Sequence, residues 1–274
     1  MQAASRESYT AVRERFDEQA RTAEPADLVT TADELLSVAG LLQRQPRLRR
    51  ALSDPSRAGE DRAELVRSLL GDRVSAPVVE LVAGLVAGRW SSSVDLLGAV
   101  EQLGVEALLA SSDRAGTLGE VEDELFRFGH VVDGDQRLGG AVADQSATVA
   151  RRTELVRGLL DGKADPVTVR LTELSVSGFG GRNFSASLAR LVELAAERRE
   201  RRVAYVTVAA PLADADEERL SANLSRIYGE QVSLKVTVDP SVIGGISVQI
   251  GHDLYDGTVL RRLNQVRGAL VGRK

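Results

Sequence analysis

The sequence predicts a mainly α-helical protein with a small α/β domain at its C-terminus. Three observations support this fold class. Apolar residues recur at helical spacing over roughly the first two hundred positions, a long segment of that region occurs twice, and strand-like alternation is confined to the last third. Because aromatic residues make up only 4% of the 274 residues, the core has to be built from Leu, Val and Ala, which favours closely packed helices over a large sheet.

The repeat is clearest when residues 33–70 are compared with residues 123–160. Fifteen of these thirty-eight positions are identical, where composition alone would give about three. The longest identical run is Glu64–Arg67, which matches Glu154–Arg157. An agreement of this length indicates an internal duplication.

Further along the chain the two copies drift out of register. Pro77 corresponds to Pro166 one residue early, and the second copy has gained a glycine-rich insertion at Gly178–Gly181. The duplication therefore predicts one helical bundle at residues 1–102 and a second at residues 103–200.

Each copy is expected to form five or six short helices in a compact bundle. In the first copy the apolar stripes lie at Tyr9–Phe16, Leu28–Leu42, Leu48–Leu52, Leu65–Leu70, Val78–Leu85 and Val94–Val100. In the second they lie at Val105–Leu109, Val121–Val131, Leu155–Leu159, Val167–Leu174 and Leu188–Leu194. Pro46 ends the second stripe, because proline inside a helix removes a backbone hydrogen bond and clashes with the preceding turn.

The last third of the chain carries a strand pattern. Apolar and polar residues alternate in Ile246–Ile250, as in a strand with one buried face. Gly244 and Gly245 precede it, where a tight turn requires residues without a Cβ. Gly251 ends the strand, and a loop is expected to lead to an amphipathic helix at Val259–Leu270.

The order of residues around this strand resembles that of the delta subunits of F-type ATP synthases, whose mitochondrial relative is the oligomycin-sensitivity-conferring protein. The matching residues are Asp239, Pro240, Ile243, Gly244, Gly245, Gly251, Asp253, Asp256 and Leu263. A mild departure is Thr258, which stands where the family usually has Ser. By this resemblance, Ala204–Ala210 and Val232–Val238 are earlier strands of a strand-helix-strand-strand-helix domain at residues 201–274.

The resemblance extends to the helical part. The second copy together with residues 201–274 looks like an ordinary delta subunit, which has one six-helix domain and one smaller α/β domain. The additional first copy is similar to the longer delta chains of actinobacteria.

The family is a structural connector, so the resemblance implies assembly and not a reaction. It implies a non-catalytic peripheral-stalk subunit that links the N-termini of the alpha subunits in the catalytic head to the C-terminus of subunit b, with beta subunits nearby. Proton-driven rotation would thereby be coupled to ATP synthesis, at the cytoplasmic face of the bacterial cell membrane. The alternative is a stand-alone helical-repeat adaptor that binds amphipathic peptides.

Delta subunits receive an alpha-subunit helix in a groove between the first and fifth helices of the helical domain, and such recognition needs apolar anchors one turn apart. By the resemblance, the second copy offers the residues Val105, Leu108, Leu109, Val167, Leu171 and Leu174. The first copy offers the residues Tyr9, Val12, Phe16, Val78, Leu81 and Leu85. Helical spacing alone equally fits plain core positions for both sets. The contact with subunit b is expected within Val203–Lys274.

Other chemistry finds little support in the residues. The glycine-rich segments Gly84–Arg89 and Gly178–Arg182 lack the Lys and the preceding strand of a phosphate-binding loop, and are expected to be loops. His130 and His252 are the only histidines and lie in different predicted domains, so no metal or nucleophile site is expected. We therefore predict no cofactor.

The remaining candidates are charged segments. Turn and helix-capping roles account for Asp253 and Asp256 without catalysis. The run Glu197–Arg202 alternates in sign, as in a solvated helix end, and the basic tail after Arg261 fits either an acidic partner or the domain's own sheet.

Composition excludes further classes of protein. The net charge of −5 argues against nucleic-acid binding. The absence of cysteine excludes disulfides and thiolate metal sites. No apolar run is long enough to cross a bilayer and the N-terminus lacks a signal-peptide pattern, so any membrane association is expected to run through partners.

Overall fold

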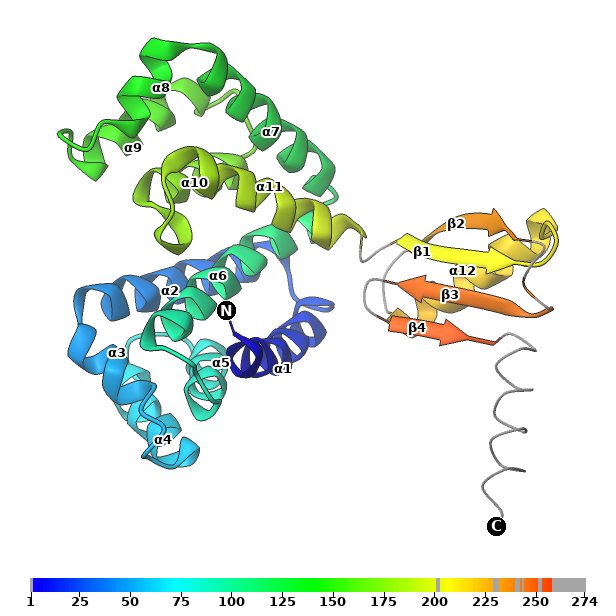
Figure 1. The fold of residues 1–274 in the computed structure, drawn as a ribbon, viewed down its shortest axis with the longest axis horizontal. Coiled ribbons are helices and arrows are strands. Elements are labelled where there is room, and N and C mark those ends of the chain that lie inside the picture. The colour runs from blue at the N-terminus through cyan, green and yellow to red at the C-terminus, as the bar shows by residue number, and fades with distance from the viewer. Residues whose placement is uncertain are drawn as a thin grey trace. The chain divides into compact units, whose positions relative to one another are not determined.

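The computed structural model describes residues 2–200, 203–228, 232–239, 242, 244–250 and 253–257. The chain forms two compact units, Met1–Ala195 and Ala196–Lys274, each with a hydrophobic core of its own. Figure 1 shows the helices of the first unit and the four-stranded sheet of the second. The mainly helical fold class with a small α/β domain is thus confirmed.

The helices follow the predicted stripes closely. The first copy contains α1 (Ala3–Ala20), α2 (Pro25–Arg44), α3 (Pro46–Leu52), α4 (Gly59–Leu70), α5 (Ala76–Ala87) and α6 (Ser93–Ala115). The second continues with α7 (Leu118–Gly134), α8 (Gln136–Ala143), α9 (Val149–Leu160), α10 (Pro166–Ser177), the 3-10 helix η1 (Phe179–Gly181) and α11 (Phe184–Glu200). Helix α8 has no predicted stripe, because Val142 is its only buried residue.

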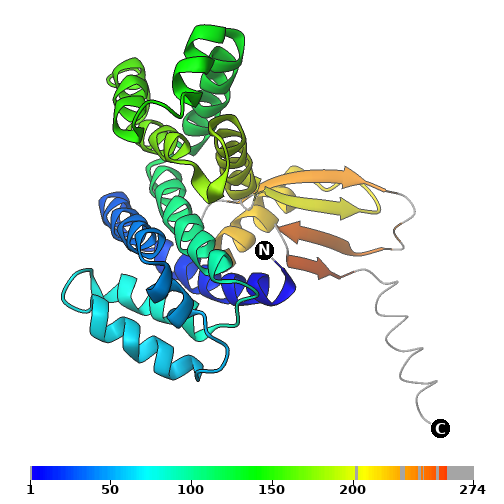
Figure 2. The same cartoon turned by 60° about the vertical axis from the view of Figure 1, so that its left-hand side comes forward.

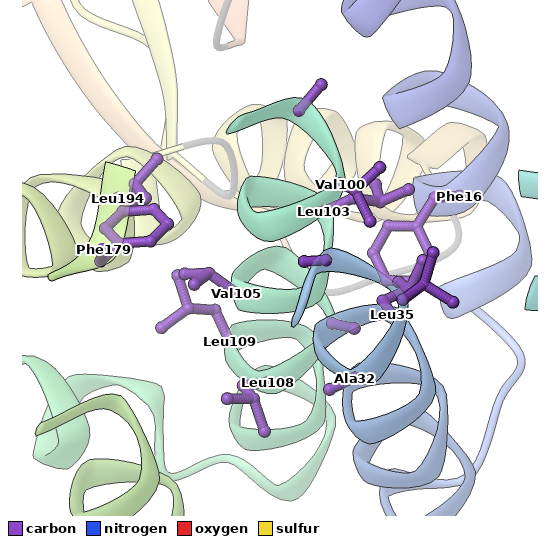
Figure 3. Packing of buried hydrophobic residues seen from close by; sticks show 14 of the residues in the cluster. Phe16, Ala32, Leu35, Val100, Leu103, Val105, Leu108, Leu109, Phe179 and Leu194 are labelled. Atoms are coloured by element: carbon purple, nitrogen blue, oxygen red, sulfur yellow. The ribbon is translucent and has the colours of Figure 1, made fainter. Parts of the chain in front are cut away.

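Helix α6 serves both copies. It is the sixth helix of the first copy and, by its position before α7, the first helix of the second. In Figure 3, Val100 and Leu103 lie on the side of Leu35 in the first copy, whereas Val105 points toward Leu194 in the second. The boundary predicted between residues 102 and 103 therefore lies inside a continuous helix.

Helices α2 and α6 lie side by side over much of their length (Figures 1 and 2). Gly104 makes this approach possible, because a Cβ at this position would lie 2.9 Å from both Cγ and Cδ2 of Leu36. Real Cβ atoms are not found that close to their neighbours, so a side chain here would force Leu36 or the helices themselves to shift.

The starts and ends of the helices have local causes. Pro25, Pro46 and Pro166 each open a helix at a position where the missing N–H has no helical partner. The Ser92 hydroxyl accepts a hydrogen bond from the N–H of Asp95 at 3.1 Å and caps α6. At the other end of α6, Gly116 adopts a left-handed conformation with φ of 79°, which favours glycine.

The second unit is a four-stranded sheet with one described helix. Its elements are β1 (Val203–Val208), α12 (Asp214–Tyr228), β2 (Ser233–Val238), β3 (Ile246–Ile250) and β4 (Asp253–Asp256). The strand order is β2-β1-β3-β4, with β1 parallel to β2 and antiparallel to β3, and β3 antiparallel to β4. Val206, Val248 and Ile250 are buried with Leu224 of α12 in one core, as the alternating pattern predicts.

Two local expectations are wrong. Residues Asp253–Asp256 were expected in a loop but form β4, because Ser247 and Ile250 pair with Asp256 and Asp253 across the sheet. This strand is too short for its alternation to be recognised in the sequence.

The second wrong expectation concerns Gly84–Ala87, which lies within α5 and not in a loop. A Cβ on Gly84 would lie 3.3 Å from Cγ2 of Val12, so this glycine lies where α1 approaches α5 closely. The closing helix expected at Val259–Leu270 lies outside the described residues.

Candidate partner-binding site

The six residues predicted to bind a partner helix in the second copy lie inside the protein. Val105, Leu108 and Leu109 of α6 are completely buried, as is Leu171 of α10. Val167 is also buried, and Leu174 is half-buried against the same core. The structure therefore brings the predicted residues together as core residues, of which Leu174 alone is half-buried.

The first copy itself covers this part of the second. Helix α2 packs along α6, and Asp33 on α2 forms an ion pair with Arg170 on α10. A contact between a partner helix and the predicted residues of the second copy stays a prediction.

The corresponding region of the first copy is open. A hollow of about 570 Å³ lies between the end of α1, the start of α2 and the start of α5. Its floor is apolar and includes Phe16, Ala20, Leu28 and Leu81. Two of the residues that the resemblance offers in the first copy, Phe16 and Leu81, therefore meet in this hollow.

The rim of this hollow is polar and carries carboxylates. Gln19, Asp27 and Glu80 are exposed and line it. Glu80 accepts a hydrogen bond from Nε of Arg67 at 2.9 Å, and this guanidinium lowers the pKa of the Glu80 carboxyl. An apolar floor with a polar rim suits an amphipathic helix.

The signature residues of the second unit build a turn. The N–H of Asp239 donates to the carbonyl of Val208 at 2.9 Å, and the N–H of Val242 donates to the carbonyl of Asp239 at 3.1 Å. Gly244 and Gly245 have φ values of 63° and 83°, in the left-handed region where only glycine is unstrained. This geometry explains the glycine pair between β2 and β3 without any ligand.

The other signature residues divide into two groups. Asp253 and Asp256 begin and end β4. Pro240, Ile243, Gly251 and Leu263 lie outside the described residues, as does His252.

Among the residues singled out for chemistry, those that the structure describes form no reactive centre. His130 lies exposed on α7, and its ring meets Phe126 edge-on with 4.5 Å between the ring centroids. Within the described part of the chain, no three His, Cys, Asp or Glu side chains are grouped so that they could hold a metal ion. No helix of that part has the length and apolarity needed to span a membrane.

A structural residue that the apolar pattern could not reveal is Arg62. Its buried guanidinium donates to the carbonyls of Val86, Ala87 and Gly88, and also to that of Asp54, so it holds the end of α5 against α4. Its repeat position is Arg152, whose Nη1 donates to the carbonyl of Val142 at 3.1 Å. Identity of these two arginines within the repeat is the signal that would have pointed to them.

The chain matches the family model described as ATP synthase delta (OSCP) subunit over residues 105–270. It is 60% identical to the ATP synthase subunit delta of Salinispora arenicola over 274 residues, which is 100% of both chains. It is 46% identical to the ATP synthase subunit delta of Streptomyces griseus over 272 residues, 99% of this chain and 100% of that relative.

A chain in the structure of the Toxoplasma gondii mitochondrial ATP synthase hexamer shares 18% identity and a TM-score of 0.36, covering 62% of this chain and 96% of that one. The family model and the full-length relatives establish the assignment: this chain belongs to the ATP synthase delta (OSCP) subunit family.

Proposed function

We propose that this chain joins the catalytic head of an F-type ATP synthase to subunit b, by binding alpha-subunit N-termini on its helical unit and the C-terminal end of subunit b on its second unit. Proton-driven rotation is coupled to ATP synthesis only if the head is held against the torque of the rotor. The complex would place the chain at the cytoplasmic face of the cell membrane, with beta subunits nearby.

Membership of the delta family makes the chain a structural component of the peripheral stalk and not a catalyst. The relatives that align over its whole length are the observation that carries the proposal, because they include the additional first copy. They are all delta subunits, so the alternative of a stand-alone adaptor finds no support.

The open hollow of the first copy is the place where we propose that an alpha-subunit helix binds. Its floor of Phe16, Ala20, Leu28 and Leu81 offers the apolar contacts that anchors one turn apart require. The floor residues of the first copy are buried as well, but they border a hollow, whereas in the second copy α2 packs on α6. Access therefore favours the first copy over the second.

Attachment at more than one place suits a subunit that carries load. Two modest interfaces on one chain act together, because release at one site leaves the other bound and the first at high local concentration. The bond between head and stalk then lasts far longer than either contact alone.

The test is binding of a labelled peptide from the alpha-subunit N-terminus to the full chain. Ala23→Trp fills the hollow from the loop after α1, and we expect it to raise the Kd at least tenfold. The matched control is Thr22→Trp on the neighbouring, exposed residue, which should bind as the native chain does. Equal affinities for both variants would rule out this hollow as the alpha-subunit site.

A further inference from the structure

A second apolar hollow in the first copy, of about 150 Å³, lies toward the other end of α2. It is lined by Leu41 of α2, Leu48 of α3, Leu69 of α4 and Val82 of α5. Figure 1 shows α3 between α2 and α4, and α3 packs on both. This hollow shares no lining residue with the one proposed for the alpha-subunit helix.

The size of the hollow suits one apolar side chain. A cavity of about 150 Å³ lined by apolar side chains accepts a benzene molecule, so the side chain of a Phe or Leu has the right size. Leu69, which lines the hollow, is 41% exposed. The hollow therefore reaches the surface at α4, where an anchor from another protein can enter it.

The segment that contributes α3 and the end of α2 is strongly basic. Residues 35–53 contain no Asp or Glu and four arginines, which are Arg44, Arg47, Arg49 and Arg50. The net charge of the whole chain is −5, so positive charge is concentrated here against the overall balance. A further arginine, Arg73, lines the hollow directly.

Three of these arginines lie close to the lining residues and are exposed. Arg44 follows Leu41 by three residues on α2, so the two are neighbours on one face of that helix. Arg47 directly precedes Leu48 on α3. Since Arg73 is exposed as well, the rim of the hollow carries guanidinium groups from three successive parts of the chain.

These arginines have no anionic partner among the residues that the structure describes. Arg44, Arg47 and Arg73 form no ion pair there, and the buried Nε of Arg49 has no hydrogen-bond partner. Asp72, the neighbour of Arg73 in the sequence, is exposed and does not line the hollow. The positive charge is therefore available to carboxylates from outside the chain.

The second copy shows that the repeat folds without this charge. The corresponding segment, residues 125–143, contains two arginines and two aspartates, so its charges balance. Gly139 and Gly140 stand where the first copy has Arg49 and Arg50. The arginines of the first copy are thus not imposed by the helix pattern that the two copies share.

We propose that this hollow binds an acidic segment of a partner protein, with one Phe or Leu side chain in the hollow and Asp or Glu side chains on Arg44, Arg47 and Arg73. The anchor follows from the volume and the apolar lining of the hollow. The carboxylates follow from the unpaired guanidinium groups, which bind carboxylates through two parallel hydrogen bonds.

Two other polyanions fit these features less well. A nucleic acid would need aromatic side chains on which bases stack, and the described residues that line the hollow include none. An anionic lipid surface would repel a chain whose net charge is −5. An acidic protein segment uses both the hollow and its rim.

The probe is a labelled peptide about 12 residues long with a central Phe and Glu on both sides, which spans about 40 Å when extended. Its binding to the full chain is measured by fluorescence anisotropy. One comparison peptide has Lys in place of every Glu, and another has Ala in place of Phe. We expect each comparison peptide to bind at least tenfold more weakly, and the preference for Glu over Lys to shrink as salt rises.

Two variants test the location. Arg47→Glu combined with Arg73→Glu reverses the charge of the rim, and Leu69→Trp fills the hollow from its exposed position. Each should raise the Kd for the Glu peptide at least tenfold. The charge-reversed variant should also bind the Lys peptide more tightly than the native chain does.

The repeat supplies a matched control for each variant. Arg137→Glu combined with Lys163→Glu, and separately Leu159→Trp, place the same changes at the equivalent exposed positions of the second copy. Both controls should bind the Glu peptide as the native chain does. Far-ultraviolet circular dichroism confirms that all four variants are folded.

Four outcomes would overturn the proposal: no binding of the Glu peptide, equal binding of the Glu and Lys peptides, equal affinity of the native and charge-reversed chains, or tighter binding to phosphatidylglycerol vesicles than to the Glu peptide. None of them bears on the proposed alpha-subunit site, because that hollow is lined by other residues and its rim carries the carboxylates of Asp27 and Glu80.

Discussion

Acidic side chains occupy the same places in both copies of the repeat and hold helix ends there. Glu34 accepts a hydrogen bond from the N–H of Ser75 at 2.9 Å, and Glu124 accepts one from the N–H of Asp165 at the same distance. Ser75 and Asp165 are the residues immediately before the fifth helix of their copies, α5 and α10. The carboxylate on the second helix, α2 or α7, thus gives each N–H a partner that it would otherwise lack. The duplication thus preserved individual hydrogen bonds as well as the helix pattern.

The equivalent arginines of the repeat, buried Arg62 and half-buried Arg152, predict unequal effects on stability. We expect Arg62→Met to lower the free energy of unfolding by about 2–4 kcal/mol, since several carbonyls lose their donor in a buried place. Arg152→Met should cost about 1 kcal/mol, because its one described bond goes to Val142. Urea titration measures both, and an equal loss in the two variants would contradict the assignment.

Glu101 of α6 predicts a dependence of stability on pH. Its carboxylate accepts a hydrogen bond from the N–H of Gly180 at 3.1 Å. Burial raises the pKa of Glu101, opposed by that N–H and by Arg182. A carboxyl with a raised pKa in the folded state stabilises the fold at low pH, and this contribution is lost as the pH rises through the folded-state pKa.

Glu101→Gln keeps an oxygen for Gly180 and removes the charge. The variant should match the native chain near pH 4 and become the more stable of the two as the pH approaches neutrality. Urea midpoints across this range measure the difference. A difference that does not change with pH would show that burial of the charge is not what affects stability here.

Among the helices, the contact of α2 with α6 depends on the absence of a side chain at one position. Gly104→Ala should lower the free energy of unfolding by about 1–3 kcal/mol, because the new methyl group meets the Leu36 side chain at 2.9 Å and overpacks this contact. Gly98→Ala on the same helix is the control. Nothing lies within 4 Å of its Cβ, so it should gain about 0.5–1 kcal/mol from helix propensity.

Thermal unfolding monitored at 222 nm distinguishes the two glycine variants by the sign of the change. If Gly104→Ala were as stabilising as Gly98→Ala, the close approach of α2 and α6 would not depend on Gly104.

For the molecule as a whole, the sharing of α6 makes the two copies one structure. The cluster of buried hydrophobic residues runs continuously from Tyr9 in α1 to Ala195 in α11. Two separate bundles would have required an exposed linker between them, but the chain passes from one copy to the other along a helix that is buried on several sides.

This arrangement predicts where the first copy can be cut. A fragment of residues 1–115 should retain its six helices and unfold cooperatively, whereas residues 1–102 lack the half of α6 that contains Leu103 and Gly104. We expect the shorter fragment to lose most of its helical signal or to unfold without a cooperative transition. Equal urea midpoints for the two fragments would contradict the shared helix.

The sequence by itself determined the helical stripes, the duplication, the strand at Ile246–Ile250 and the family. These features depend on local spacing, such as the alternation in Ile246–Ile250, or on residue order, as in the turn at Gly244 and Gly245. Local spacing and residue order are properties of the sequence itself, so they can be recognised without coordinates.

Tertiary structure alone decided which of two similar surfaces is open. Leu81 of α5 borders the hollow of the first copy, whereas Leu171 of α10 is completely buried in the second. Phe126 and Leu36 likewise occupy the same repeat position, with one exposed and the other against α6. Burial depends on which helix lies across the surface, and that partner is distant in the chain and absent from any local pattern.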